Sequence, residues 1–345
     1  MLIVIQTVFE VSRVPVEEVR KNASFGRPHL VILGAGASRQ AFPQGDACGR
    51  KLPTMLDLTE VLELDSLLAS APVPYRGRNF EDVYSDLAIH PDCAALMRKL
   101  EDIVHQYFST LELPNKPTLY DYLLLSLRPK DGIATFNWDP LLLMSASRLA
   151  SKVELPYLMF LHGNVAIGYC EQDRQKGPVA GRCSKCGTRY KPARLLYPVK
   201  QKNYQADVSV FREWRDISKA LKSAYTLTIF GYSAPVTDVE AKRLMTQAWG
   251  KAAQRELEQI EIIDILAEDE LRNRWSEFIL EHHFEVTTDF YSSRIGRHPR
   301  RSCEAIWSQF MEMRIFEEDP LPREVDLNEL VDSIKPYLEW ETRAV

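Results

Sequence analysis

Short apolar runs that end in glycine or polar residues recur along the chain and predict the strands of a parallel sheet. The runs span residues 29–33, 132–136, 156–161, 225–230 and 260–266. Each run is shorter than a typical helix, and several are rich in β-branched residues, as is usual for strands buried on both faces. Because open parallel sheets bind ligands at the carboxyl ends of their strands, we expect a ligand site at that edge.

The segments between these runs predict the rest of the architecture. Asn79 precedes two acidic residues and is predicted to begin a helix, and Pro140 is predicted to occupy the first position of another. Together these features favour a doubly wound, Rossmann-like α/β fold with a parallel sheet. The predicted units are an N-terminal arm (1–29), a main domain (30–295) with a helical insertion near 55–130 and a ribbon-like insertion near 165–200, and a helical C-terminal extension (296–345).

Composition narrows the class of protein. The 345 residues are 45% hydrophobic and 26% charged, which is typical of a soluble globular protein and excludes a collagen, a disordered chain and a membrane-spanning chain. The net charge of −5 makes direct binding of nucleic acid an unfavoured interpretation. The apolar opening, residues 2–11, is too short to span a membrane and lacks the basic leader of a signal peptide. We therefore expect a cytoplasmic protein without a membrane partner.

A dense basic run, Arg294-x-x-Arg297-His298-Pro299-Arg300-Arg301, departs from this balanced composition. Such clusters usually lie on a solvated surface or at a subunit contact. Binding of an acidic protein partner and contact with a nucleic-acid backbone are the alternatives.

The cysteines are too few and too unevenly spread for a disulfide framework, but three of them have the spacing of a metal site. Cys183-x-x-Cys186-Gly is the knuckle of a zinc ribbon, and Cys170 lies 13 residues upstream at the spacing of a first pair. The position expected for the fourth cysteine holds Asp173. The sequence predicts either a structural zinc site completed by Asp173 or a histidine, or a knuckle held by local packing alone.

Polar residues at the ends of the predicted strands are the candidates for chemistry. Gly34-x-Gly36-x-Ser38 follows the first strand and indicates either a phosphate-binding turn or merely a tight connection to a helix. Later strands end in Thr135-Phe-Asn137-Trp-Asp139, in His162-Gly163 and in Gly231-Tyr-Ser233.

These four motifs, in this order, resemble the sirtuin superfamily over residues 30–266. The resemblance implies that Gly34, Ala35, Gly36 and Ser38 bind NAD. It further implies that the Thr135-x-Asn137-x-Asp139 strand end holds the nicotinamide ribose, that His162 is catalytic, and that Gly231 and Ser233 contact the cofactor. In that family a four-cysteine zinc module follows the catalytic histidine, which is where Cys170, Cys183 and Cys186 lie.

Departures from the deacylase pattern indicate the branch. The proline-aspartate-phenylalanine-arginine segment of histone-deacylase sirtuins is replaced by residues 52–57, and the strand that pairs with an acyl-lysine peptide is replaced by residues 197–204. The Pro-Thr54-Met-x-Asp57 loop, the helix start at Asn79 and the run from Gly231 to Asp238 resemble sirtuin-like proteins of bacterial antiphage systems. The resemblance implies cofactor contacts by Thr54, Asp57 and Asp238.

The residues themselves suit cleavage of the nicotinamide-ribose bond, which passes through an oxocarbenium-like state. Asn137 can orient the carboxamide or the attacking water, since an amide both donates and accepts. His162 can act as a base. Asp139 either stabilises developing positive charge, holds Asn137 in place, or only caps the helix after Pro140. Asp264 either binds the adenosine ribose hydroxyls or is a commonplace acid at a strand end.

The sequence thus leads to the hypothesis of an NAD hydrolase that yields ADP-ribose and nicotinamide and depletes NAD in antiphage defence by abortive infection. The resemblance implies regulation by homo-oligomer formation or by a separately encoded partner such as an ATPase. Two alternatives stay open: an NAD-dependent protein-lysine deacylase, and a non-catalytic subunit that binds NAD or ADP-ribose as a sensor or in assembly.

Overall fold

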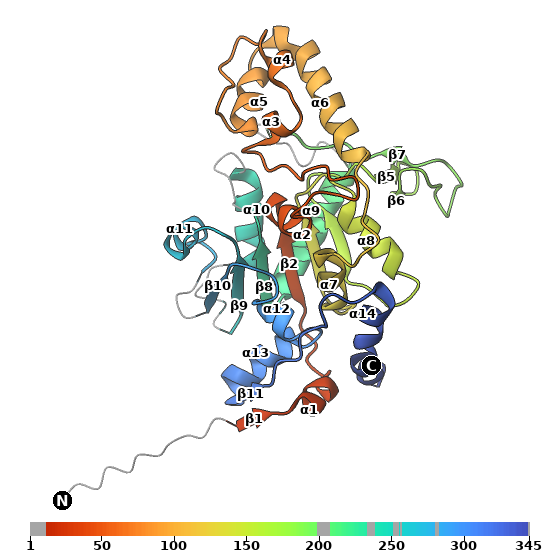
Figure 1. The fold of residues 1–345 in the computed structure, drawn as a ribbon, viewed down its shortest axis with the longest axis vertical. Coiled ribbons are helices and arrows are strands. Elements are labelled where there is room, and N and C mark those ends of the chain that lie inside the picture. The colour runs from red at the N-terminus through yellow and green to blue at the C-terminus, as the bar shows by residue number, and fades with distance from the viewer. Residues whose placement is uncertain are drawn as a thin grey trace, which may run out of the picture.

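A six-stranded parallel sheet forms the centre of the protein, as seen in a computed structural model that describes residues 12–198, 208–232, 239–250, 255, 257–279 and 283–343 (Figure 1). The strand order is β10-β9-β8-β2-β3-β4. The strands are β2 (His29–Leu33), β3 (Gly132–Thr135), β4 (Tyr157–Phe160), β8 (Thr226–Phe230), β9 (Gln259–Ile263) and β10 (Phe284–Thr287). The five predicted strands are confirmed, and so is the doubly wound α/β fold. β10 was not predicted, because it is a half-buried edge strand that includes a charged residue, Glu285.

The strand order places the motif-bearing turns side by side. β2 lies between β3 on one side and β8 on the other, and both pairs are parallel. The chain therefore reverses its direction of progress across the sheet at β2, which is the position where open α/β sheets bind ligands.

Helices cover both faces of the sheet because alternate strand residues point to opposite sides. In β2, Val31 and Leu33 belong to one apolar cluster, and Leu30 and Ile32 belong to the other. The first cluster includes residues from α2 (Ala35–Ala41), α7 (Leu119–Leu125), α8 (Leu141–Leu149), α12 (Arg294–Arg297) and α14 (Leu327–Ser333). The second includes residues from α9 (Val208–Ser223), α10 (Val239–Trp249) and α11 (Glu268–Arg274).

A group of helices stands above the edge of the sheet at which the strands end (Figure 1). It comprises α3 (Leu58–Val61), α4 (Asp65–Leu68), α5 (Phe80–Ala88), η1 (Pro91–Cys93) and α6 (Ala94–Ser109). Asn79 caps α5 as predicted, since its side chain accepts a hydrogen bond from the backbone N–H of Glu81 at 2.9 Å. The prediction for Pro140 is wrong by one position. Helix α8 begins at Leu141, and Pro140 is its N-cap residue. The carboxylate of Asp139 accepts the N–H of Leu141.

A small antiparallel ribbon follows β4 and lies beside the main sheet. Its strands are β5 (Ile167–Cys170), β6 (Gln175–Pro178) and β7 (Lys191–Pro192), in the order β6-β5-β7. Glu213 of α9 links the ribbon to the sheet, because its buried carboxylate accepts hydrogen bonds from Lys176 in β6 and from the N–H of Phe160 in β4.

The two ends of the described chain pack together below the sheet (Figure 1). β1 (Ser12–Val14) pairs in parallel with β11 (Arg314–Phe316), and α1 (Val16–Lys21) contacts α15 (Lys335–Glu341). α13 (Ser302–Met311) packs on β11.

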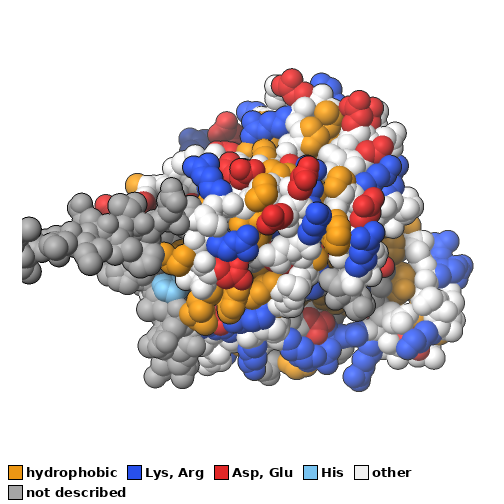
Figure 2. Space-filling view, turned by 90° about the horizontal axis from the view of Figure 1, so that it is seen from below, with side chains coloured by type: hydrophobic (Ala, Val, Ile, Leu, Met, Phe, Trp, Pro, Cys, Tyr) orange, Lys and Arg blue, Asp and Glu red, His pale blue; other side chains and the backbone are white. Residues whose placement is uncertain are grey.

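The interpretation of the basic run as a solvated surface or as a contact for a protein or nucleic-acid partner is wrong for Arg300 and Arg301. Arg300 and Arg301 are 2% and 0% exposed, and both bind the carboxylate of Glu341. Arg294 and Arg297 form ion pairs with Glu285. The burial of these arginines could not be predicted from the local sequence, because their acidic partners lie in other elements of the chain. Figure 2 shows that the surface seen from below carries both signs of charge interspersed.

Among the described helices, none combines the length and the apolar character needed to cross a membrane.

Candidate functional site

The turns that follow β2, β3 and β8 meet at the carboxyl edge of the sheet. The side-chain amide of Asn137, after β3, donates a hydrogen bond of 2.9 Å to the carbonyl oxygen of Gly34, after β2. The N–H of Gly36 donates to the carbonyl oxygen of Gly231, after β8, at 3.0 Å. These two hydrogen bonds directly join three of the four predicted motifs.

Close backbone contact explains the glycines of these turns. A Cβ atom on Gly34 would lie 2.4 Å from the carbonyl oxygen of Gly231, and one on Gly231 would lie 2.2 Å from the nitrogen of Ala37. Gly231 also has a φ of +60°, which favours glycine. The turn after β2 is thus at least a tight connection, one of the two readings that the sequence allowed. A role of Gly34, Ala35, Gly36 and Gly231 in phosphate binding stays a prediction.

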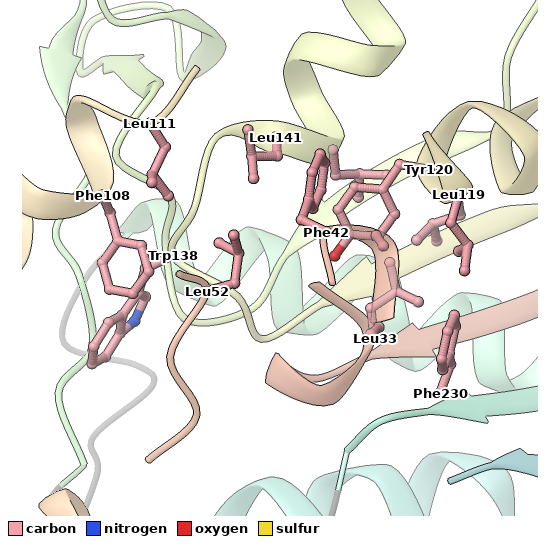
Figure 3. Close-up of a cluster of buried hydrophobic side chains, with 14 of the residues drawn as sticks. Leu33, Phe42, Leu52, Phe108, Leu111, Leu119, Tyr120, Trp138, Leu141 and Phe230 are labelled. Atoms are coloured by element: carbon pink, nitrogen blue, oxygen red, sulfur yellow. The ribbon is translucent and has the colours of Figure 1, made fainter. Parts of the chain in front are cut away.

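A buried polar cluster joins four side chains behind the turn of β3. The hydroxyl of Ser38 lies 2.6 Å from the hydroxyl of Tyr120 and 2.7 Å from the carboxylate of Asp139. The amide nitrogen of Asn137 donates to the Ser38 oxygen at 2.9 Å and lies 3.4 Å from the Tyr120 hydroxyl. Figure 3 shows Tyr120 beside Phe42 among buried apolar side chains. Polar groups in such a place need hydrogen-bond partners, and these four provide them for one another.

Asp139 serves two of the roles that the sequence left open. One carboxylate oxygen accepts from Ser38, which in turn contacts Asn137, and the other accepts the N–H of Leu141 and so begins α8. Burial raises the pKa of Asp139, although these hydrogen bonds oppose the shift. Since the carboxylate is 4% exposed, stabilisation of developing positive charge by direct contact stays a prediction.

His162 follows β4 and is 8% exposed. Its ring meets the ring of Phe136 edge-on, with 4.7 Å between centroids, and Phe136 in turn stacks on Tyr232 at 4.1 Å. The backbone carbonyl of His162 accepts the N–H of Leu196, so the segment leaving the ribbon returns to this turn. His162 is therefore positioned by apolar and aromatic packing from neighbouring strand ends.

Two residues of this region carry no prediction from the sequence. Asn164 donates to the backbone carbonyl of Asp139 and thereby ties the turn after β4 to the turn after β3. Its position after the His-Gly pair at a strand end was a usable signal. Tyr120 gave no such signal, because it stands in an apolar helical run, where a tyrosine is most simply a core residue.

Thr54 and Asp57 lie together in the loop that leads to α3. The carboxylate of Asp57 accepts from the N–H and the hydroxyl of Thr54 and forms an ion pair with Arg39. Partial burial opposes the charged form, but the hydrogen bonds from Arg39 and Thr54 and the charge of Arg39 hold the pKa of Asp57 below its ordinary value. Arg39 comes from α2, so this loop is fastened to the turn that begins with Gly34.

The remaining predicted residues have local roles or lie outside the described chain. The hydroxyl of Thr135 accepts the N–H of Asn137 at 3.0 Å, and the carboxylate of Asp264 accepts the N–H of Leu266 at 3.0 Å. Both contacts shape the turns at strand ends. Ser233 and Asp238 lie outside the described residues.

The cysteine cluster has the geometry of a metal site. The ligand atoms of Cys170, Asp173, Cys183 and Cys186 all lie within 4.8 Å of one another. The sulfur atoms of Cys170 and Cys186 are 3.5 Å apart, and the Cys183 sulfur lies 3.2 Å from an oxygen of Asp173. A tetrahedral zinc ion with bonds of about 2.0 to 2.3 Å places its ligands at similar separations. Three thiolates and a carboxylate thus fit zinc, and the fourth member of this cluster is Asp173 and not a histidine.

Comparisons with known proteins find likeness to solved structures only: no protein-family model matches the chain, and neither does any curated protein. A Sir2 homologue mutant in complex with ADP-ribose is 15% identical, covers 72% of this chain and 84% of that chain, and has a TM-score of 0.35. A structure described as a structural basis for the mechanism and regulation of Sir2 enzymes is 14% identical, covers 85% of this chain and 99% of that chain, and has a TM-score of 0.40. A Sir2 complex with a p53 peptide and NAD+ is 14% identical, covers 79% and 91% of the two chains, and has a TM-score of 0.36. Likeness of this size assigns no family, so the function has to be sought in the residues of the site.

Proposed function

We propose that the protein is an NAD hydrolase that cleaves the nicotinamide-ribose bond of NAD to give nicotinamide and ADP-ribose. One observation supports this function above others: Asn137 is held at the carboxyl edge of the sheet, at the strand-order reversal, by hydrogen bonds to Gly34 and to the Ser38 cluster. An amide fixed in this way does not have to reorganise during the reaction, which is the condition for strong electrostatic catalysis.

The proposed reaction breaks the bond between the nicotinamide nitrogen and C1′ of the ribose. The bonding electrons stay with nicotinamide, which leaves as a neutral molecule, and a water oxygen forms the new bond to C1′. Asn137 orients the carboxamide or this water, and His162 accepts the proton that the water loses, or first takes one from a ribose hydroxyl. Asp139 acts through Ser38 by holding Asn137 in place.

The proposed cofactor contacts follow the same edge of the sheet. Backbone groups of the turn that begins with Gly34, together with Gly231 and Ser233, are assigned to the pyrophosphate and the adjoining sugars. Thr54 and Asp57 are assigned to the loop that covers the nucleotide, and Asp264 is assigned to the adenosine ribose. Thr135 and Asp238 complete the proposed set. The zinc ion proposed for the cluster of Cys170, Cys183, Cys186 and Asp173 would be structural, since it supports the ribbon that returns to His162.

The biological setting is part of the proposal. An unrestrained NAD hydrolase would kill the cell that makes it, so we propose that the protein acts in antiphage defence and is inactive until triggered. Assembly of several copies, or binding of a separately encoded ATPase or other partner, would supply the control. Nicotinamide release that rises on addition of a lysate from phage-infected cells would support this regulation, and full activity of a monodisperse monomer would contradict it.

The decisive experiment measures nicotinamide release from NAD by the purified protein, alone and with the infected-cell lysate. His162→Ala and Asn137→Ala are each expected to lower kcat by about 100-fold or more. His105→Ala is the matched control, since His105 lies on the exposed side of α6 and forms a hydrogen bond with Ser109 of the same helix.

Three other outcomes would replace the proposal. Release of O-acyl-ADP-ribose only in the presence of an acylated peptide would identify a deacylase. Tight binding of ADP-ribose without nicotinamide release would identify a binding subunit. If the protein bound neither NAD nor ADP-ribose, the hydrolase, the deacylase and the binding subunit would all be contradicted.

A further inference from the structure

We propose that Tyr120 is a positioning residue which, with Ser38 and Asp139, turns Asn137 into a group that only accepts hydrogen bonds from the substrate side. This inference deepens the proposed function and rests on it, because it concerns the residue assigned to the reaction centre. It follows from counting donors and acceptors within the buried cluster.

The hydroxyl of Ser38 has one proton and two acceptor positions, and all three are used. Its proton points to a carboxylate oxygen of Asp139, which lies 2.7 Å away and accepts it. The oxygen then has to accept from its two other neighbours, the hydroxyl of Tyr120 at 2.6 Å and the amide of Asn137 at 2.9 Å. Each proton in this cluster therefore has one direction.

The same count determines the orientation of Asn137. Both of its amide hydrogens are used, one on the carbonyl oxygen of Gly34 and one on Ser38. Exchanging the nitrogen and oxygen of the amide would place its oxygen against the carbonyl of Gly34, with no hydrogen between them. The side-chain oxygen of Asn137 is thus the part left for the site. It can accept from the attacking water, a ribose hydroxyl or the carboxamide nitrogen, and it cannot donate to the carboxamide oxygen.

Tyr120 is suited to this task by its surroundings. It is 1% exposed, and its ring packs edge-on against Phe42 with 5.7 Å between centroids. Burial raises the pKa of the Tyr120 phenol, so it keeps its proton and remains a donor to Ser38. Because its side chain is buried behind Asn137, Tyr120 acts on the substrate side through Ser38 and Asn137.

The first test compares Tyr120→Phe with Tyr122→Phe. Both tyrosines belong to α7, but the hydroxyl of Tyr122 donates to the carbonyl of Pro322, away from the cluster. Loss of one hydrogen bond to Ser38 is expected to lower kcat for nicotinamide release by about tenfold in Tyr120→Phe. The KM for NAD and the dissociation constant of ADP-ribose are expected to stay within about twofold, since ADP-ribose lacks the nicotinamide.

Asp139→Asn gives a larger perturbation. The new amide directs a donor at Ser38, so three donors compete for two acceptor positions and Asn137 loses its orientation. The expected fall in kcat is about 100-fold, again with ADP-ribose affinity retained. Turnover of Tyr120→Phe equal to that of Tyr122→Phe would overturn the inference, and so would a loss of ADP-ribose affinity that equals the loss of kcat.

A measurement that needs no turnover separates this inference from the proposed function. In an NMR spectrum of the 15N-labelled protein, both side-chain amide hydrogens of Asn137 are expected to exchange slowly with solvent, and faster in Tyr120→Phe. Fast exchange in the wild-type chain would show that the cluster is not formed as described. Slow exchange in a protein that releases no nicotinamide would leave the cluster intact and remove the hydrolase proposal alone.

Discussion

The two ends of the central sheet both bury polar side chains, but they do so in different ways. At the carboxyl end, Ser38, Tyr120, Asn137 and Asp139 are joined by hydrogen bonds, and no Lys or Arg among the described residues forms an ion pair with Asp139. At the amino end, the buried Glu304 and the largely buried Glu341 are matched by cations. The carboxyl end thus carries one buried acid without a counter-ion, which is an arrangement typical of functional sites.

The amino end illustrates the opposite principle. Glu341 binds both Arg300 and Arg301, and the fully buried Glu304 binds Arg128 and lies 3.6 Å from Lys130. These pairs join α15 and α13 to the loop before β3, so they hold the last described helix against the sheet. The comparison teaches that paired buried charges of this kind hold elements of the chain together, whereas the hydrogen-bonded cluster at the other end presents one oriented amide.

The largest expected effect on stability comes from breaking the amino-end network. Glu341→Ala leaves two buried arginines without their counter-ion and is expected to lower the free energy of unfolding by about 3 kcal/mol. Urea denaturation measures this value, with Glu339→Ala on the exposed side of α15 as the control. Nicotinamide release per folded molecule should be unchanged, and a parallel loss of kcat would break the distinction between the two ends.

The free energy of unfolding, measured over a series of pH values, tests the pKa of the buried acid of β9. Glu261 accepts from Thr228 and from the N–H of Arg294, and it also faces Glu285; burial raises its pKa to about 7. Its ordinary pKa applies in the unfolded chain, so the folded state binds more protons between about pH 4.5 and 7 and loses stability as the pH rises through that window.

The substitution Glu261→Gln removes this loss of stability with rising pH, because glutamine does not titrate. The free energy of unfolding of the variant minus that of the wild type is expected to grow by about 2 to 3 kcal/mol from pH 5 to pH 8. The proton uptake of His29, whose pKa burial lowers to about 3, is common to both chains and cancels in this difference. A difference that does not vary with pH would show that Glu261 is ionised throughout.

Zinc binding tests whether the residues at the carboxyl end of the sheet depend on the ribbon that holds the cysteine cluster. We expect about one zinc per chain by elemental analysis, and removal by a chelator should lower kcat through the Leu196 contact with the carbonyl of His162. Asp173→Cys should retain zinc at chelator concentrations about tenfold higher, because thiolates bind zinc more strongly than a carboxylate does. Cys48→Ala, at an exposed cysteine outside the cluster, is the control. Wild-type protein free of metal would contradict this expectation.

The smallest expected effect concerns the loop of Thr54 and Asp57. Arg39→Gln removes a half-exposed ion pair and should change the free energy of unfolding by less than about 1 kcal/mol. The KM for NAD should increase while kcat stays the same, because the loop is proposed to contact the nucleotide and not the reaction centre. A change in kcat alone would place Arg39 with the Asn137 cluster instead.

Features that depend on near neighbours in the chain could be predicted from the sequence. The buried strands could be recognised as short apolar runs, because a strand covered on both faces needs apolar side chains at most of its positions. Asn79 was identifiable as a helix cap because capping involves residues two or three positions apart. The spacing of Cys183 and Cys186 likewise indicated a metal site that the structure makes geometrically complete.

Features that depend on distant contacts were decided only by the tertiary structure. Whether the basic run would be solvated depended on Glu341, which lies 41 residues after Arg300. The role of Tyr120 and the direction of the Asn137 amide depended on Ser38, 82 and 99 residues away. Sequence patterns identify the residues that lie at one edge of the sheet. The hydrogen-bond partner of each of these residues is decided by packing between segments far apart in the chain, because a buried polar group pairs with the partner that the fold places beside it.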